Sequence, residues 1–165
     1  MTVEPGTAET AQRDVVVALG PVLFAYDGSE LAALAIEQAG RQLATGRDAL
    51  VVCVWQPADV GFSPVEGQHF DAADATEVHQ AAEETAAYGA SLAEQAGFRA
   101  QALAVEAAPT WKGIVNVAED HDCSLIVLGS HGRTGLASVL IGSVAEAVAA
   151  HSPRSVLITH RRKQA

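Results

Sequence analysis

Apolar residues gather in five short runs rich in β-branched side chains, and longer segments with helical spacing lie between them. The runs are Val22–Tyr26, Ala49–Trp55, Phe98–Val105, Leu125–Gly129 and Ser155–Thr159. Three of them are continuous apolar blocks without alternation, which is typical of strands covered on both faces. Strands that alternate with helices through short links pair in parallel with right-handed crossovers. The pattern predicts an α/β fold, a three-layer sandwich of five strands and four helices.

The first two predicted helices are defined by apolar stripes and by their end signals. Glu30–Thr45 carries one apolar stripe, with Ser29 as its N-cap and Gly46 as its stop signal. Thr76–Ala96 is rich in alanine and glutamate and ends at Gly97. Each helix therefore fits between two of the predicted strands.

The last two predicted helices begin at recognisable start signals. Pro109 is expected at the first position of the third helix. Ser143 and Glu146 have the S-x-x-E spacing of a capping box, which predicts that the fourth helix begins near Ser143 and reaches about His151.

Length and segment composition predict one domain with short extensions. The chain has 165 residues, and a domain takes roughly 100–200. Residues 1–19 are expected to be a flexible N-terminal arm, residues 20–160 the domain and residues 161–165 a C-terminal tail. Gln56–Ala75 is acidic and broken by proline and glycine, which predicts a mobile flap. Its charge would oppose an anion if the flap folds inward, or its Phe62 and Phe70 would instead cover a ligand.

Charge and cysteine content narrow the function classes. The formal net charge is −10, so nucleic acid and anionic membrane surfaces are not expected partners. The apolar run Ala49–Trp55 is far shorter than the roughly 18 residues of a membrane span, and Met1–Arg13 lacks the features of an export signal. Cys53 and Cys123 are expected to be reduced small hydrophobes, which agrees with a cytoplasmic protein.

Candidate chemistry follows the strands, because ligands of open parallel sheets bind at the carboxyl ends of the strands. Asp27 follows the first strand, and the fourth strand leads into Gly129-Ser130-His131-Gly132-Arg133. Nine residues later, Gly142-Ser143 opens a helix. Glycines at this spacing before a helix N-terminus favour phosphate binding through bare amides and the helix dipole. The pattern is neither a Walker loop nor the G-x-G-x-x-G dinucleotide motif.

These residues resemble the universal stress proteins, whose nucleotide-binding members carry G-x2-G-x9-G-(S/T). Gly129, Gly132, Gly142 and Ser143 match without a gap, and the resemblance extends over about Pro21 to His160. It implies five parallel strands in the order 3-2-1-4-5, a Rossmann-like fold similar to the adenine nucleotide α-hydrolases. It also implies ATP, AMP or ADP at the reversal of strand order, with Mg²⁺ or Mn²⁺ held by the phosphates, and homodimers paired through Ser155–Thr159.

The resemblance also implies a set of ligand-binding residues. Asp27 would contact adenine and ribose, and Ala25 and Val54 would flank the base. The phosphates would be held by Gly129, Gly132, Arg133, Gly142, Ser143 and Val144. The adjoining Tyr26, Ser130 and His131 complete the candidate site.

The residues alone leave several of these roles open. Asp27 fits either ribose binding or an Asx turn before Gly28, and Ser143 fits phosphate binding as well as helix capping. Arg133 is either a phosphate partner or a solvated loop residue. The bulk of Trp55 would either wall the adenine or shrink the site.

The absence of a recognisable catalytic group decides the preferred function. The sequence shows no nucleophile with an adjacent base, no paired acid and base, and no spacing typical of protein metal ligands. We therefore expect a nucleotide-binding accessory factor in stress tolerance, with at most slow ATP hydrolysis and an unknown protein partner. The alternatives are a hydrolase-type enzyme and a dimerisation module of the same fold that binds no nucleotide.

Overall fold

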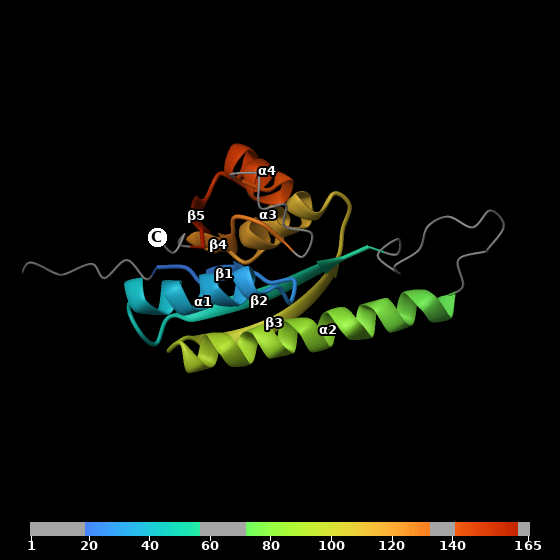
Figure 1. The fold of residues 1–165 in the computed structure, drawn as a ribbon, viewed down its shortest axis with the longest axis horizontal. Coiled ribbons are helices and arrows are strands. Elements are labelled where there is room, and N and C mark those ends of the chain that lie inside the picture. Colours follow the sequence, from blue (N-terminus) through green and yellow to red (C-terminus); the bar gives the residue numbers. More distant parts are fainter. Residues whose placement is uncertain (1–18, 57–71, 133–140, 162–165) are drawn as a thin grey trace, which may run out of the picture.

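The computed structural model describes residues 19–56, 72–132 and 141–161. Five strands and four helices alternate along this part of the chain (Figure 1). They are β1 (Val22–Ala25), α1 (Glu30–Gln42), β2 (Asp48–Trp55), α2 (Ala72–Gln95), β3 (Arg99–Glu106), α3 (Thr110–Asp120), β4 (Leu125–Gly129), α4 (Ser143–His151) and β5 (Ser155–Thr159).

All five strands pair in parallel in one sheet, in the order β3-β2-β1-β4-β5. α1 and α2 cover one face of the sheet, and α3 and α4 cover the other (Figure 1). The predicted three-layer fold and its strand order are thus confirmed. Because β1 lies between β2 and β4, the direction of chain progression reverses between β1 and β4, which is where such sheets bind ligands.

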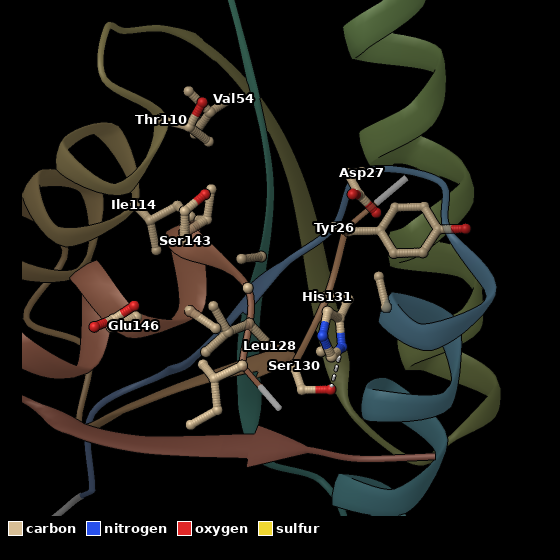
Figure 2. Close-up of a pocket in the computed structure, with 18 of the residues that line it drawn as sticks. Tyr26, Asp27, Val54, Thr110, Ile114, Leu128, Ser130, His131, Ser143 and Glu146 are labelled. Atoms are coloured by element: carbon tan, nitrogen blue, oxygen red, sulfur yellow. Dashed lines mark hydrogen bonds between the residues drawn. The ribbon is translucent and has the colours of Figure 1, made fainter. Parts of the chain in front are cut away.

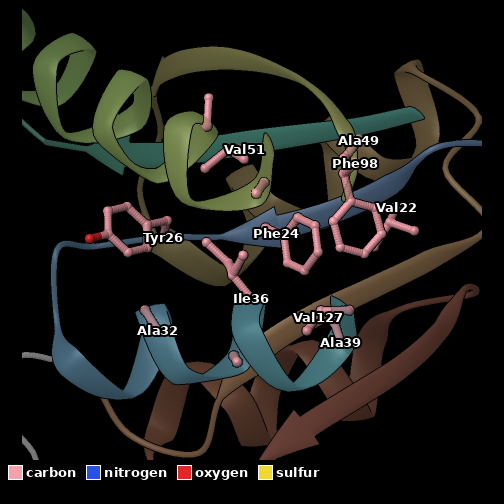
Figure 3. Packing of buried hydrophobic residues seen from close by; sticks show 13 residues of the cluster. Val22, Phe24, Tyr26, Ala32, Ile36, Ala39, Ala49, Val51, Phe98 and Val127 are labelled. Carbon is pink, nitrogen blue, oxygen red and sulfur yellow. The ribbon is translucent and has the colours of Figure 1, made fainter. Parts of the chain in front are cut away.

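Two hydrophobic clusters hold the layers together, one on each face of the sheet. Val22, Phe24 and Tyr26 of the β1 segment pack toward α1 and α2 (Figure 3). Leu23, between them in sequence, packs toward α3 and α4, as the alternation of side chains along a strand requires. The ring centroids of Phe24 and Phe98 are 5.1 Å apart in an edge-to-face contact. Burial on both faces explains why the strands read as continuous apolar blocks.

The predicted ends of several elements are displaced by a few residues. α1 ends at Gln42, before the predicted Thr45, and Gly46 instead forms the turn that leads into β2, with φ +77°. Pro109 is the N-cap of α3, one residue before the helix begins. Ser29 caps α1 as predicted, since its side chain accepts a hydrogen bond from the amide of Ala32 at 3.2 Å.

The predicted capping box at α4 is wrong. Gly142 is the N-cap, its amide donates to the carbonyl of Ser130 at 2.6 Å, and its carbonyl accepts from the amide of Glu146 at 2.9 Å. The helix therefore starts one residue earlier than a capping box at Ser143 requires. Ser143 becomes the first helical residue, and no side-chain hydrogen bond caps the helix.

The predicted C-terminal bound of the flap at 56–75 is wrong. Its last four residues belong to α2, which begins at Ala72 rather than at Thr76. Residues 57–71, including Phe62 and Phe70, lie outside the described residues, as do residues 1–18 of the predicted arm at 1–19 and residues 162–165 of the predicted tail at 161–165. Cys53 and Cys123 are buried, and neither forms a disulfide, as predicted.

Candidate functional site

A cavity of about 600 Å³ opens at the carboxyl end of the sheet, where β1 and β4 end side by side (Figure 2). Eleven residues predicted for the site line this cavity: Ala25, Tyr26, Asp27, Val54, Gly129, Ser130, His131, Gly132, Gly142, Ser143 and Val144. The remaining predicted residue, Arg133, lies outside the described residues. The structure thus brings together groups from β1, β2, β4 and the start of α4.

Glycines keep the backbone accessible around the cavity. A Cβ added at Gly129 would lie 2.9 Å from the Cγ of Leu31, and one at Gly132 would lie 2.8 Å from Oδ2 of Asp27. A Cβ at Gly142 would lie 3.0 Å from the carbonyl oxygen of Ser130. Side chains at these positions would collide with α1, with the Asp27 carboxylate or with the loop, so the close approach of these segments depends on glycine.

The start of α4 gives the cavity a cluster of hydrogen-bond donors. The first internal hydrogen bond of the helix joins the amide of Glu146 to Gly142, so the amides of Ser143, Val144 and Ala145 have no intrahelical acceptor. All three residues line the cavity. Their amides and the positive end of the helix dipole make this wall suited to an anion.

Asp27 combines the two roles that its sequence position left open. Its Oδ1 accepts a hydrogen bond from the amide of Ser29 at 3.0 Å, which forms the local turn. Gly28 within that turn has φ +82°, as expected for a turn glycine. The other carboxylate oxygen lies toward Gly132, and Asp27 lines the cavity (Figure 2). One oxygen thus holds the turn while the other is placed to meet a ligand.

Tyr26 borders the cavity, but its ring points away from it (Figure 2). The ring packs into the core beneath Gly89 and lies near Tyr88, with ring centroids 6.5 Å apart. Burial, followed by the charge of Tyr88, raises the pKa of the Tyr26 hydroxyl above its usual 10.0. Tyr26 therefore contributes backbone to the cavity, and its side chain fixes α2 against the sheet.

Both sequence-based alternatives for Trp55 are wrong. Trp55 is buried on the α2 side of β2, in a cluster with Cys53, Ala82 and Ala86. Its ring centroid lies 5.4 Å from that of His79, and it does not line the cavity. Side chains alternate along a strand, so the neighbour that faces the cavity is Val54.

Ser130 and His131 form a contact that the sequence did not predict. Ser130 Oγ lies 3.0 Å from His131 Nδ1 (Figure 2), which resembles a nucleophile beside a base. Ser130 is only 2% exposed, however, and a nucleophile must reach its substrate. The pair therefore shapes the loop after β4 rather than presenting a reactive hydroxyl.

Sequence reasoning missed eight residues that line the cavity. They are Ala32, Val52, Thr110, Ile114, Leu128, Ile141, Ala145 and Glu146. Strand alternation from Val54 points to Val52, and helix geometry points to Ala145 as the third free amide. Thr110 follows β3 at the same edge of the sheet. The sequence-based prediction considered only the residues that follow the other strands.

The described residues include neither a cluster of metal ligands nor a membrane-spanning helix. No group of three or more histidine, cysteine, aspartate or glutamate side chains in this part of the chain could hold a metal ion. No helix in the same ranges is long and apolar enough to cross a membrane.

The fold and the cavity together define a Rossmann-like α/β protein with a cavity at a reversal of strand order. A model of the universal stress protein family matches residues 19–160. The chain belongs to the universal stress protein family.

Known relatives agree with this assignment. Universal stress protein MJ0577 of Methanocaldococcus jannaschii is 39% identical over 69 residues, which are 42% of each chain. The matched stretch thus spans less than half the length of this curated relative. The solved structure of MJ0577 superposes with a TM-score of 0.70 at 24% identity, covering 90% of this chain and all of that one.

Two further solved structures share the fold at low identity. A universal stress protein in complex with cAMP has a TM-score of 0.60 at 22% identity, covering 87% of this chain and 98% of that chain. The universal stress protein from Archaeoglobus fulgidus in complex with dAMP has a TM-score of 0.54 at 23% identity, covering 86% and 98%. At these identities the likeness establishes the fold.

Proposed function

We propose that this chain binds an adenine nucleotide, either ATP or its products AMP and ADP, in the cavity between β1 and β4. The amides of Ser143, Val144 and Ala145, which face the cavity without intrahelical acceptors, carry the proposal. Because the chain has a net charge of −10, it can attract a polyphosphate only through local dipoles such as these. The nucleotide would make the protein a responsive accessory factor in stress tolerance in the cytoplasm, a role taken from the family.

The residues of the cavity fit such a ligand. Its volume of about 600 Å³ lies within the roughly 300–1,000 Å³ of typical small-molecule sites. Gly132 and Gly142 leave room for phosphates beside the start of α4, and Asp27 offers a carboxylate oxygen to ribose hydroxyls. Mg²⁺ or Mn²⁺ would be held by the phosphates themselves.

The base would lie at the apolar end of the cavity. Ala25, Val52, Val54 and Ile114 line that wall, and apolar side chains suit the faces of a purine ring. The cAMP and dAMP complexes of the structural relatives support the same ligand class.

The geometry favours binding over turnover. A hydrolase needs an accessible nucleophile or a base that activates water. Ser130 is buried, and its contact with His131 lies within the loop. We therefore expect at most slow ATP hydrolysis.

Equilibrium titration with ATP by calorimetry tests the proposal. We expect binding between micromolar and millimolar concentrations. Gly132→Val should abolish it, because even the Cβ would lie 2.8 Å from Asp27 Oδ2 and the branched methyls would fill the phosphate space. Ala87→Val adds two methyl groups at an exposed position of α2 and should bind ATP like the wild type. No heat of binding with ATP, ADP or AMP would contradict the proposal.

We also propose that the protein is a homodimer paired through β5. β5 lies at the edge of the sheet, and its Val156, Leu157 and Ile158 are half-buried. An apolar edge strand presents unpaired backbone groups to a second copy. Antiparallel pairing predicts a dimer in sedimentation at tens of micromolar protein, and a monomer at that concentration would contradict it.

A further inference from the structure

The hydroxyl of Thr110 lies on the apolar wall where the base is proposed to bind. In Figure 2 Thr110 is well separated from Ser130 and His131 near the loop after β4, and Thr110 and Val54 both line the cavity. The neighbouring lining residues on this wall, Val52, Val54 and Ile114, are apolar. A polar group on such a wall is placed to orient a ligand.

Two features fix the position of Thr110. It is the first residue of α3, and Gly113 in the same turn allows this helix to approach β2 closely. A Cβ at Gly113 would lie 3.1 Å from a methyl carbon of Val54 and 2.7 Å from the Cβ of Ala107. Beyond the end of β2, Gln56 Nε2 donates a hydrogen bond to Thr110 Oγ1 at 3.2 Å.

The bond from Gln56 sets the role of the threonine hydroxyl. A hydroxyl has one hydrogen to donate and two lone pairs that accept. Because Oγ1 accepts from the Gln56 amide, its own hydrogen cannot point at that donor and is directed elsewhere. Since Thr110 lines the cavity, the hydrogen is available to an acceptor on a bound ligand.

We propose that Thr110 is a base-recognition residue that donates a hydrogen bond to a ring nitrogen of adenine, and that Gln56 positions it. This inference rests on the proposed function. The threonine hydroxyl would hydrogen-bond to the edge of the base and so distinguish one base from another. The apolar wall contacts only the faces of the ring. A ring nitrogen of adenine is an acceptor, so it can take the hydrogen that Thr110 Oγ1 does not direct at Gln56.

Deaza analogues of ATP, each with one ring nitrogen replaced by C–H, provide the test. For the wild type, the analogue that lacks the recognised nitrogen should bind about 5- to 10-fold more weakly than ATP, as the loss of one hydrogen bond predicts. Thr110→Val keeps the shape of the side chain, and it should bind ATP about as weakly and lose the discrimination between ATP and that analogue. Thr110→Ser keeps the hydroxyl and should restore both.

A double variant tests the positioning role of Gln56. Gln56→Ala alone should weaken ATP binding, whereas Gln56→Ala combined with Thr110→Val should bind no worse than Thr110→Val, because Gln56 acts through the hydroxyl. Thermal unfolding of each variant would establish that the fold is retained.

The outcomes separate this inference from the proposed function. If the wild type binds ATP but no deaza analogue is weaker, or if Thr110→Val keeps the discrimination, Thr110 does not recognise the base and only this inference fails. If the wild type binds no adenine nucleotide at all, the proposed function fails and this inference fails with it.

Discussion

Asp27→Asn separates the two roles that the structure assigns to this side chain. Oδ1 accepts from the amide of Ser29 at 3.0 Å, and Oδ2 lies toward Gly132 in the cavity. Asparagine keeps a carbonyl oxygen for the Ser29 amide, so the turn before α1 should remain. It loses the negative charge and one acceptor, so ribose hydroxyls should be held less well.

The size of the effect follows from the type of hydrogen bond lost. Hydrogen bonds to charged groups contribute about 1.5–3 kcal/mol and neutral ones about 0.5–1.5 kcal/mol. The difference of about 1–1.5 kcal/mol predicts ATP binding weaker by roughly 5- to 12-fold. The effect on stability should stay within about 0.5 kcal/mol, because the turn is kept.

The direction of the change in ATP affinity distinguishes a lost contact from a general effect of charge. The chain carries a net charge of −10, so removing any carboxylate reduces its repulsion of ATP. A loss of affinity in Asp27→Asn therefore has to come from a lost contact. Asp48→Asn is the matched control, because Asp48 is exposed at the amino end of β2, away from the cavity.

Calorimetric titration of both variants with ATP, together with thermal unfolding, completes the test. Asp48→Asn should bind ATP at least as tightly as the wild type. The reasoning is refuted if Asp27→Asn retains full affinity, or if both variants lose affinity equally.

Three further predictions concern stability. Ser29→Ala removes the N-cap bond to the Ala32 amide and should lower the unfolding free energy by about 1 kcal/mol in chemical denaturation; an unchanged value would contradict the capping role. Glycine to alanine stabilises an exposed helix, but Gly89→Ala should destabilise this protein by about 1–3 kcal/mol. The reason is that the new Cβ would lie 2.6 Å from the Tyr26 ring. A raised melting temperature would contradict this packing. Burial raises the pKa of Cys123 above 9.0 and that of Tyr26 above 10.0. The folded state therefore holds these protons more tightly than the unfolded state does, and the free energy of unfolding should fall as pH rises above about 9. Urea titrations at several alkaline pH values check this, and Cys123→Ala should make the decline shallower.

The sequence predicted the layers and most of the cavity because both follow from backbone regularities. Buried parallel strands read as apolar blocks, and the groups that follow them must meet at one edge of the sheet. The meeting of Asp27 with Gly129, Gly132 and Gly142 could therefore be predicted from the sequence.

Side-chain direction and helix starts could not be predicted in the same way. Side chains alternate along β2, so Val54 faces the cavity and Trp55 faces α2. The capping box at Ser143 failed because the backbone bond from Gly142 to Ser130 starts the helix one residue earlier. The position of Thr110 at the cavity depends on the close approach of α3 to β2 at Gly113, and sequence spacing does not predict this tertiary contact.

A crystal structure of the full chain grown with ATP would show directly whether the cavity binds the nucleotide. We expect phosphates within hydrogen-bond distance of the amides of Ser143, Val144 and Ala145, ribose at Asp27 and the base beside Val54. A nucleotide bound elsewhere, or a cavity that remains empty at saturating ATP, would contradict it.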